Sequence, residues 1–364
     1  MDSCDVLIVG GGPAGSSCAW GLRSSGMHVL ILDKANFPRN KICGGWITPW
    51  VLRALEIEAA DYSPGRTMQE IRGFRVSSIE AREVSIPYDR VISYGIRRCE
   101  FDEYLLRRSG AEIREGSLIS KIERFDGHWI INGAIQAKML VGAGGHFCPI
   151  ARHLGNTNSD EPVIAQEIEF EMSPDQARLC AIQPEIPELY FCRDFQGYGW
   201  CFRKGNFLNI GLGRLDQHAL SQHVVHFLHF LRKTGKVVFD LPGKFAGHAY
   251  LLFGYGKRRV VGDSVMLIGD SAGLAFPQSG EGIRPAVESG LLAAKIIRSA
   301  NGHYARESMQ AYSDLLKKQF GDGTGSPSGV VARLPRRLRN SFARFLFTKQ
   351  WFCRRVVVEN WFLR

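Results

Sequence analysis

The sequence predicts an α/β protein in which a discontinuous, largely parallel-sheet domain is interrupted by a second sheet-containing domain. Three observations lead to this fold class. Residues 5–32 contain an apolar strand, a glycine-rich turn, a helix and a second apolar strand, which is the order of a βαβ unit. Residues 70–95 and 165–214 alternate apolar and polar positions between turn signals, as antiparallel strands do. Residues 260–268 return to a buried-strand pattern, so the first domain is expected to resume late in the chain.

The composition is that of a globular protein. The chain has 364 residues, 45% hydrophobic and 23% charged, with a formal net charge of +10, which excludes a disordered chain and suits anionic partners. Its nine cysteines form no Cys-x-x-Cys pair, so we expect reduced thiols, a cytoplasmic location and no metal site. No run of 18 apolar residues is present and no signal peptide is evident, so no transmembrane helix is predicted.

The first βαβ unit carries a dinucleotide-binding pattern. Asp5–Val9 and Met27–Leu32 are the expected strands, and Pro13–Ser25 is the expected helix. Between the first strand and the helix, the glycines of Gly10-x-Gly12-x-x-Gly15 permit a tight turn, close approach of a pyrophosphate and close helix packing. Asp33 ends the second strand, where a carboxylate accepts the ribose hydroxyls of an adenosine. The alternative is a glycine turn without a ligand.

A second motif separates FAD from NAD. Leu267-Ile-Gly-Asp-Ser-Ala-Gly273 places Asp270 after a strand, and Phe276-Pro-Gln-Ser-Gly-Glu-Gly-Ile283 leads into a helix over 282–300 that packs through small residues. The N-terminus of that helix favours negative charge, such as that of a reduced flavin. A helix cap in an ordinary βα turn is the alternative for Asp270. The two motifs together resemble the FAD-dependent hydroxylase superfamily, in which this Asp holds the ribityl chain.

Three short segments are similar to the geranylgeranyl reductase branch of that superfamily. They are Lys41-Ile-Cys43-Gly44-Gly45, Gly197-Tyr198-Gly-Trp200-Cys-Phe202 with Gly211-Leu-Gly213, and Pro277-x-x-Gly280-Glu281-Gly282-Ile283. Arg98, in Arg98-x-x-Phe101-Asp102, resembles the superfamily arginine that contacts the cofactor, although a surface-helix arginine is the alternative. The resemblance spans residues 5–300. The expected cofactor-binding residues are Gly10, Gly12, Pro13, Ala14, Gly15, Asp33, Lys34, Lys41, Gly44, Gly45, Arg98, Gly269, Asp270, Pro277, Gly280, Gly282 and Ile283.

The resemblance implies a GxGxxG Rossmann-like FAD-binding domain, a mixed or antiparallel-sheet substrate domain and a C-terminal helical tail. We expect the FAD-binding domain at 1–70, 95–160 and 255–300, the substrate domain at 70–95 and 160–255, and a basic helical region at 301–364.

The predicted catalytic residues are Cys43, Tyr198 and Trp200. Aromatic residues at 198, 200 and 202 would share one face of a strand and form an apolar wall for a lipophilic substrate, with core packing as the alternative. Cys43, beside Lys41, is a candidate proton donor, with an inert buried cysteine as the alternative. The predicted reaction is reduction of carbon–carbon double bonds in an isoprenoid-like or other lipophilic molecule.

Two departures from the family pattern bear on the chemistry. Gly144 stands where the superfamily usually has an Asp tied to nicotinamide contacts, so the reductant, NAD(P)H or ferredoxin, stays open. Arg203 replaces the family proline after Phe202 and is expected to place a cation near the substrate.

Two other functions are considered. One is a flavin-dependent monooxygenase or halogenase acting on a small aromatic or lipophilic molecule. The other is a flavin-binding envelope-associated protein without robust turnover, similar to a colicin-resistance type in the family. Substrate identity and oligomeric state stay open.

The C-terminal tail is basic and aromatic. After a Gly/Ser/Pro-rich hinge at 321–329, residues 333–364 contain nine Lys or Arg, one acid and many aromatic residues, which suits peripheral contact with an anionic membrane at its inner face. The alternative is a helical cap packed on the protein. No nucleic-acid binding is expected.

Overall fold

The chain divides into two compact units. The computed structural model describes residues 1–156, 162–216, 219–254, 258–321 and 336–363. Unit 1 comprises Met1–Asn40, Cys99–Glu161 and Tyr250–Gly325, and unit 2 comprises Lys41–Arg98, Pro162–Ala249 and Ser326–Arg364. Residues 41–70, which the sequence assigned to the FAD-binding domain, fall in unit 2 because their strands pair with strands of that unit.

Unit 1 is built around an eight-stranded sheet. Its strands are β1 (Asp2–Val9), β2 (Val29–Leu32), β8 (Glu112–Arg114), β9 (Ile122–Phe125), β10 (His128–Ile131), β11 (Ile135–Gly142), β17 (Val261–Gly262) and β18 (Val265–Leu267). They lie in the order β17-β18-β11-β1-β2-β8, with β10 and β9 extending from β11. The β1–β2, β1–β11, β2–β8 and β11–β18 pairs are parallel. Val6, Leu7 and Ile8 are fully buried, as expected for a parallel strand covered on both faces.

The predicted strand over 260–268 is interrupted in the structure. β17 and β18 pair with each other in antiparallel fashion, and Ser264 between them has φ of +53°. A left-handed residue reverses the chain direction, so the apolar run forms a hairpin instead of one strand.

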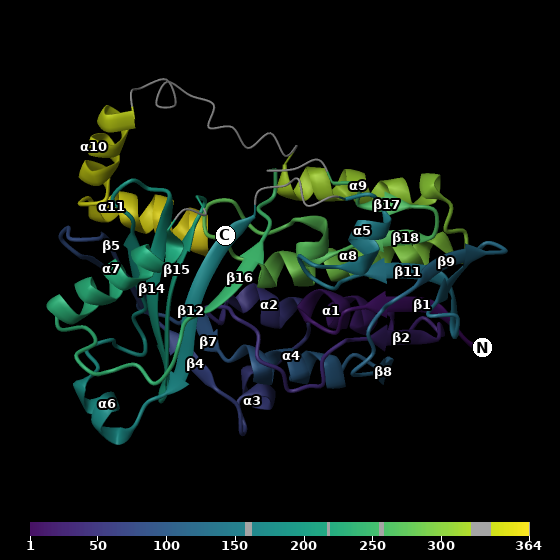
Figure 1. Ribbon diagram of the computed structural model, residues 1–364, viewed down its shortest axis with the longest axis horizontal. Coiled ribbons are helices and arrows are strands. Elements are labelled where there is room, and N and C mark those ends of the chain that lie inside the picture. The colour runs from purple at the N-terminus through teal and green to yellow at the C-terminus, as the bar shows by residue number, and fades with distance from the viewer. Residues whose placement is uncertain (157–161, 217–218, 255–257, 322–335, 364) are drawn as a thin grey trace. The chain divides into compact units, whose positions relative to one another are not determined.

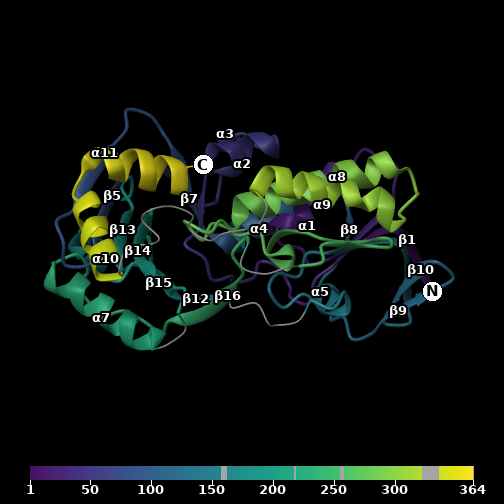
Figure 2. The ribbon, with the colours of Figure 1, turned by 90° about the horizontal axis from the view of Figure 1, so that it is seen from above.

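Helices of unit 1 pack close to this sheet and to one another. They are α1 (Pro13–Leu22), α4 (Arg98–Arg107, whose first residue falls in unit 2), α5 (Pro149–His153), the 3-10 turn η1 (Gly269–Ala272), α8 (Ile283–Ala300) and α9 (Arg306–Phe320). α8 and α9 lie side by side (Figures 1 and 2). α1 packs against α8 through small residues: a Cβ on Gly21 would lie 2.7 Å from the Cβ of Ala294.

Unit 2 contains a seven-stranded mixed sheet. Its strands are β5 (Gly73–Ser78), β6 (Val84–Pro87), β12 (Val163–Glu171), β13 (Glu188–Phe191), β14 (Gly197–Lys204), β15 (Phe207–Arg214) and β16 (Ala246–Tyr250). They lie in the order β16-β12-β15-β14-β13-β5-β6. The β13–β5 pair is parallel, whereas β12–β15 and β14–β15 are antiparallel. The predicted α/β class with a mixed-sheet second domain is confirmed.

Smaller elements complete unit 2. They are the three-stranded sheet β3 (Trp46–Ile47), β7 (Ser93–Ile96) and β4 (Met68–Ile71), with helices α2 (Pro49–Ala54), α3 (Ala59–Tyr62), α6 (Pro174–Leu179) and α7 (Leu220–Lys233). α7 covers one face of the large sheet, where Phe227 lies so close to β14 that a Cβ on Gly199 would be 2.6 Å from its ring. Phe227 also contacts Tyr190 of β13.

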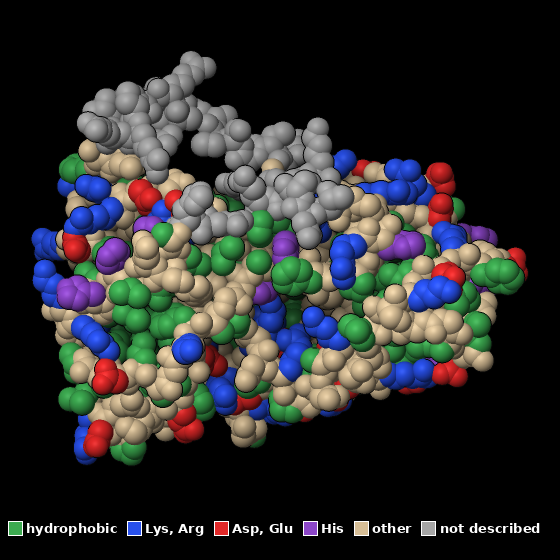
Figure 3. Space-filling model, in the orientation of Figure 1, with side chains coloured by type: hydrophobic (Ala, Val, Ile, Leu, Met, Phe, Trp, Pro, Cys, Tyr) green, Lys and Arg blue, Asp and Glu red, His purple; other side chains and the backbone are tan. Residues whose placement is uncertain are grey.

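The C-terminal tail is helical in its described part. It contains α10 (Arg336–Leu346), α11 (Gln350–Phe352) and the π-helical segment η3 (Cys353–Phe362), so the predicted helical tail is confirmed. The predicted hinge, apart from Gly321, lies outside the described residues, as do Arg333 and Arg364 of the basic segment. Lys and Arg side chains are also scattered over the face shown in Figure 3. Among the described residues, no helix combines the length and apolar character needed to cross a bilayer.

Candidate functional site

The glycine motif forms a tight turn between β1 and α1 in unit 1. Gly10 has φ of +115°, and a Cβ there would lie 2.4 Å from the carbonyl oxygen of Ala143. A Cβ on Gly15 would lie 1.9 Å from the carbonyl oxygen of Gly10. Neither position accepts a side chain, because backbone occupies the space. Gly12 is the N-cap of α1 without a side-chain cap, and Pro13 follows it, which leaves the positive end of the helix open to an anion.

Asp33 is held rigidly after β2. Its two carboxylate oxygens accept hydrogen bonds from the backbone N–H groups of Gly11, at 2.7 Å, and Ala35, at 2.8 Å. The side chain is 9% exposed, and a carboxylate keeps further lone pairs for hydroxyl groups. The neighbouring Lys34 is exposed. Asp33 is therefore placed as a ribose-binding acid would be.

Arg39 is a residue of this turn that the sequence motif did not reveal. A Cβ on Gly12 would lie 3.3 Å from its Nη2 atom, and the same atom lies 3.3 Å from Oδ2 of Asp102. Asp102 is fully buried on α4. A fixed guanidinium beside the open end of α1 suits a pyrophosphate.

The second motif lies against the first within unit 1. Gly269 has φ of +60°, and a Cβ there would be 2.9 Å from the Cβ of Ala14. Asp270 follows in η1, and a Cβ on Gly282 would lie 3.2 Å from its Oδ1 atom. Gly282 is the N-cap of α8 without a side-chain cap, and the first turn holds no acid.

The loop before α8 is tightly packed. Gly280 has φ of +69°, and a Cβ there would lie 2.5 Å from the hydroxyl of Tyr250. Pro277 is half-buried and Ile283 is 4% exposed. Glu281 is buried, and neither of its carboxylate oxygens has a hydrogen-bond partner among the described residues. Burial raises the pKa of Glu281 to about 8, against the opposing effect of Arg284.

These unit 1 residues fit a dinucleotide. Two helix N-termini without side-chain caps or first-turn acids, at α1 and α8, favour negatively charged groups. Asp33 and Asp270 supply acceptors for hydroxyl groups. The glycines remove the side chains that would fill the space along the turn.

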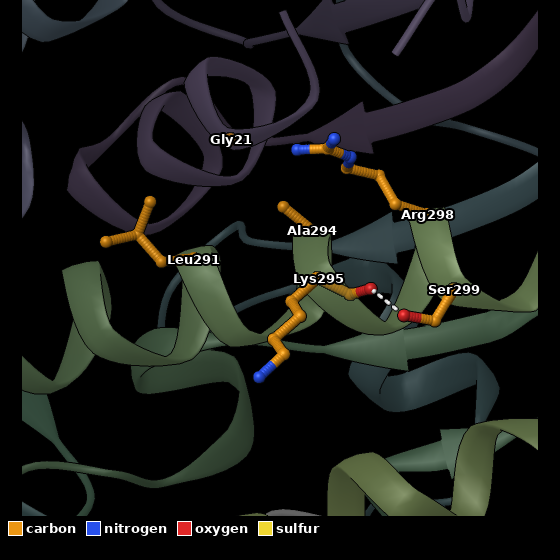
Figure 4. A pocket seen from close by; sticks show the side chains of 6 residues that line it. All are labelled: Gly21, Leu291, Ala294, Lys295, Arg298 and Ser299. Atoms are coloured by element: carbon orange, nitrogen blue, oxygen red, sulfur yellow. Dashed lines mark hydrogen bonds between the residues drawn. The ribbon is translucent and has the colours of Figure 1, made fainter. Parts of the chain in front are cut away.

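A separate depression lies between α1 and α8 (Figure 4). It is lined by Gly21, Leu291, Ala294, Lys295, Arg298 and Ser299. Its one drawn hydrogen bond joins Ser299 to the carbonyl of Lys295, at 3.0 Å. It contains none of the motif glycines and no acidic residue, so it is not the dinucleotide site.

In unit 2, the Cys-Gly-Gly loop lies on one face of the large sheet. Asn209 of β15 donates to the carbonyl of Cys43, at 3.3 Å, and accepts from the Trp200 indole, at 2.7 Å. A Cβ on Gly44 would lie 3.2 Å from the ring of Phe202. The structure thus brings Cys43, Gly44 and Trp200 together. Within the loop, the Gly45 N–H donates to Sγ of Cys43, at 3.5 Å.

A buried lysine, Lys204, holds the Cys-Gly-Gly loop in place. Nζ of Lys204, 1% exposed, donates to the carbonyls of Gly44 and Ile96, each at 3.0 Å, and forms an ion pair with Glu169. Gly45 has φ of +65°, and a Cβ there would lie 2.1 Å from the carbonyl oxygen of Ile96. The backbone of Ile96 therefore leaves no space for a side chain at position 45.

A carboxyl group of β12 also contacts the loop. Glu167 is 5% exposed, and its Oε1 accepts a hydrogen bond from the backbone N–H of Cys43. Burial raises the pKa of Glu167 to about 7, although the Cys43 hydrogen bond and Lys204 lower it. Arg39, Glu167, Lys204 and Asn209 were not predicted from the sequence; their contacts join residues far apart in the chain.

The predicted aromatic residues share one face of β14. Tyr198, Trp200 and Phe202 alternate with residues that face α7. Trp200 lies flat over β15, where a Cβ on Gly211 would be 2.1 Å from its ring. Tyr198 is half-buried and lies 5.9 Å from Trp200, between ring centroids.

Arg203 does not place a cation on this aromatic face. Neighbouring residues of a strand point to opposite faces, so Arg203 points away from Phe202. Its guanidinium donates to the carbonyls of Ala177 and Gly205, each at 3.2 Å. The expectation of a substrate-side cation at 203 is therefore wrong.

The remaining predicted residues occupy separate places. Nζ of Lys41 lies 2.7 Å from Nε2 of His248 on β16, within unit 2. Arg98 begins α4 and is 9% exposed. A side chain at Gly144 would meet Cys148, because its Cβ would lie 3.2 Å from the Cα of that residue.

The described tail packs partly on the sheet of unit 2 and is partly exposed. Phe362 contacts Tyr198 and Trp46, with ring centroids 5.5 Å and 5.6 Å away, and Phe347 contacts Phe191 at 4.6 Å. By contrast, the side chains of Phe342, Phe345 and Trp351 are 47%, 54% and 59% exposed. Part of the tail therefore packs on unit 2, as a helical cap would. Another part exposes aromatic side chains, as a segment that contacts a membrane would.

Comparisons with known proteins agree with this arrangement. Residues 8–68 match the family described as NAD(P)-binding Rossmann-like domain. The chain is 29% identical to a menaquinone reductase of Mycobacterium tuberculosis, over 95% of this chain and 86% of that protein. It is 26% identical to digeranylgeranylglycerophospholipid reductase 1 of Methanothermobacter thermautotrophicus, over 87% of this chain and 83% of that protein.

Solved structures share the fold. A geranylgeranyl bacteriochlorophyll reductase-like protein from Thermoplasma acidophilum matches with a TM-score of 0.76 and 22% identity, covering 96% of this chain and 91% of the other. A flavin-dependent brominase matches with a TM-score of 0.75 and 20% identity, covering 100% of this chain and 92% of the brominase chain. The long sequence matches to reductases, the two glycine motifs and the shared fold agree with one another. Over most of its length, the chain resembles the geranylgeranyl reductase family of FAD-dependent oxidoreductases.

Proposed function

We propose that this enzyme uses FAD to reduce carbon–carbon double bonds of an isoprenoid-like or other lipophilic substrate. The observation that carries the proposal is the position of the half-buried Cys43 on the aromatic face of Trp200 and Phe202. A thiol beside an apolar wall suits protonation of a carbon atom in a hydrocarbon chain. Relatives named as reductases of menaquinone and of a geranylgeranyl lipid support this substrate class.

The residues take the following roles in this proposal. Bound FAD supplies hydride chemistry. Cys43 holds the proton that one alkene carbon receives, and solvent afterwards returns a proton to its sulfur. Tyr198 and Trp200 hold the hydrocarbon and exclude water. In unit 1, the proposed cofactor-binding residues are Gly10, Gly12, Pro13, Ala14, Gly15, Asp33, Lys34, Gly269, Asp270, Pro277, Gly280, Gly282 and Ile283.

The proposal is tested by anaerobic reduction of the purified flavoprotein. The reduced protein is mixed with a polyprenyl alkene or menaquinone, and separately with air-saturated buffer. The expected result is reoxidation of the flavin by the polyprenyl alkene, or by menaquinone with loss of one side-chain double bond in the product, together with slow reaction with oxygen. Rapid oxygen reaction through a C4a-hydroperoxide absorbance indicates the monooxygenase or halogenase alternative, and reoxidation by neither lipid indicates an envelope-associated protein without turnover.

The electron donor is identified in the same experiment. NAD(P)H and reduced ferredoxin are offered separately, and the donor that bleaches the flavin at a rate matching turnover is the reductant. Because Gly144 lacks the carboxylate linked to nicotinamide contacts in the superfamily, we expect bleaching by NAD(P)H to be slower than bleaching by ferredoxin.

We also propose that the tail segment 333–364 contacts an anionic membrane at its cytoplasmic face. The exposed aromatic residues Phe342, Phe345 and Trp351 are interspersed with Arg344 and Lys349. Aromatic rings enter the interfacial region of a bilayer, while cations bind anionic headgroups. Such contact would place the enzyme where lipophilic substrates are found.

A further inference from the structure

A buried carboxyl group contacts the backbone of the candidate proton donor. Glu167 lies on β12, 124 residues from Cys43 in sequence, and its Oε1 accepts the Cys43 N–H. Its other oxygen, Oε2, is buried without a hydrogen-bond partner among the described residues. Since a buried carboxylate without full solvation is costly, this group is unlike an ordinary structural acid.

The charged groups around Glu167 do not neutralise it by direct pairing. Lys204 of β14 is engaged with the carbonyls of Gly44 and Ile96 and forms its ion pair with Glu169. Glu169 adds a like charge from the same strand. Asn209 of β15 is neutral, with its amide directed to the Cys43 carbonyl and to Glu169. The Cys43 N–H, Lys204 and the Asn209 amide all favour the ionised form of Glu167, but burial outweighs them.

We propose that Glu167 is a positioning residue that controls Cys43 through its own protonation state. When ionised, it holds the Cys43 N–H with a charge-assisted hydrogen bond. When protonated, it holds the loop less firmly. The inference rests on the proposed function only for the role given to Cys43; the contact and its switching stand without it.

Ionisation of Glu167 strengthens its hydrogen bond to the Cys43 N–H. Hydrogen bonds to a charged acceptor are roughly twice as strong as neutral ones, so the loop is held more firmly above the pH at which Glu167 ionises. Burial raises the pKa of Glu167 to about 7, so this strengthening of the hydrogen bond sets in across neutral pH.

The first measurement uses the unmodified full chain. Hydrogen exchange of the Cys43 amide is followed by fragmentation mass spectrometry at pH 6 and at pH 8.5, and each rate is divided by the intrinsic rate at that pH. The protection factor is expected to rise about fivefold, because the stronger hydrogen bond contributes roughly 1 kcal/mol. An unchanged protection factor overturns the proposal.

The second measurement compares Glu167→Gln with the unmodified chain. Gln keeps a neutral acceptor at every pH. Alkylation of Cys43 by iodoacetamide is read from its own peptide, which separates it from the partly exposed Cys99. The variant-to-parent rate ratio is expected to be about 1 at pH 6 and about 5 at pH 8.5, because only in the parent does ionisation strengthen the hydrogen bond that holds the loop and limits access to the thiol. A ratio that is the same at both pH values indicates a merely structural role and overturns the proposal.

Glu171→Gln is the matched control, since Glu171 lies on the same strand and is exposed. Its ratio is expected to stay near 1 at both pH values. If Glu167→Gln does not fold, the exchange measurement on the unmodified chain decides alone. Neither measurement uses turnover or a lipid substrate, so both can be interpreted even if the proposed function is wrong.

Discussion

Gly290 of α8 lies directly against Ala14 of α1, so that a Cβ on Gly290 would stand 2.4 Å from the carbonyl oxygen of Ala14. Ala14 belongs to the glycine turn after β1, and α8 begins at the second motif, after Asp270. Asp270 follows Gly15 by 255 residues in the sequence, yet this contact fixes the distance between the two helix N-termini in unit 1. Small residues are needed where two helix backbones approach so closely.

Gly290→Ala is therefore expected to force α1 and α8 apart. Overpacking of this kind costs about 1–3 kcal/mol of unfolding free energy, and the shift of the helix ends should also weaken FAD binding. Urea unfolding and FAD titration measure the two effects. Gly247→Ala is the control, because no atom lies within 4 Å of a Cβ there; an equal loss in both variants would contradict the packing argument.

Lys204→Met should destabilise unit 2 strongly. It leaves Glu169 and two backbone carbonyls without the buried ammonium that they share, and removal of one partner of a buried pair costs about 3 kcal/mol. Thermal unfolding checks the loss. The double variant Lys204→Met with Glu169→Gln should regain part of it, because the negative charge that Lys204 balanced is gone.

The surface pair of Lys121 with Glu123 provides the comparison, with side chains 64% and 45% exposed. Exposed pairs contribute little, so Lys121→Met should leave the unfolding temperature unchanged. Equal effects at positions 121 and 204 would show that the burial of Lys204 is unimportant.

Local patterns predicted the parts of the site that depend on local backbone geometry. Gly10, Gly15 and Asp33 occur within one βαβ unit, where spacing alone fixes the turn. The contact of Glu167 with Cys43 depends on how β12 pairs with β15 and on where the loop crosses the sheet. No periodicity encodes such a contact, and the same holds for Arg39 beside Gly12. Arg203 directly follows Phe202 in β14, so strand alternation turns its side chain to the opposite face.

Glu281 should make stability depend on pH. Burial raises its folded-state pKa from 4.5 to about 8, so the folded protein binds the proton more tightly than the unfolded chain. The contribution of Glu281 to the free energy of unfolding is therefore fully present at acid pH and is lost as pH rises from about 5 to about 8. Glu281→Gln should remove this loss and be more stable than the parent at pH 8, by on the order of 3 kcal/mol.

Urea unfolding at pH 5 and pH 8, with equal FAD content, measures this difference, because bound ligand also stabilises the folded state. Glu307→Gln is the control, since Glu307 is exposed on α9. If the stability difference between Glu281→Gln and the parent is the same at both pH values, Glu281 is not a buried acid that gains a proton on folding.

The tail is best tested by substitution, because its deletion would also remove Phe347 and Phe362 from the sheet of unit 2. Phe345→Ser with Trp351→Ser changes only exposed rings. Losing two rings from the interface should weaken binding to anionic vesicles at least tenfold, since burial of each ring contributes roughly 1.5–3 kcal/mol.

Binding of the parent should also fall at high salt, because the cations are screened. Vesicle flotation measures both effects, and Phe125→Ser, at a ring 75% exposed in unit 1, should float like the parent. Equal flotation of the tail variant and the parent would leave the tail as a cap on unit 2 alone.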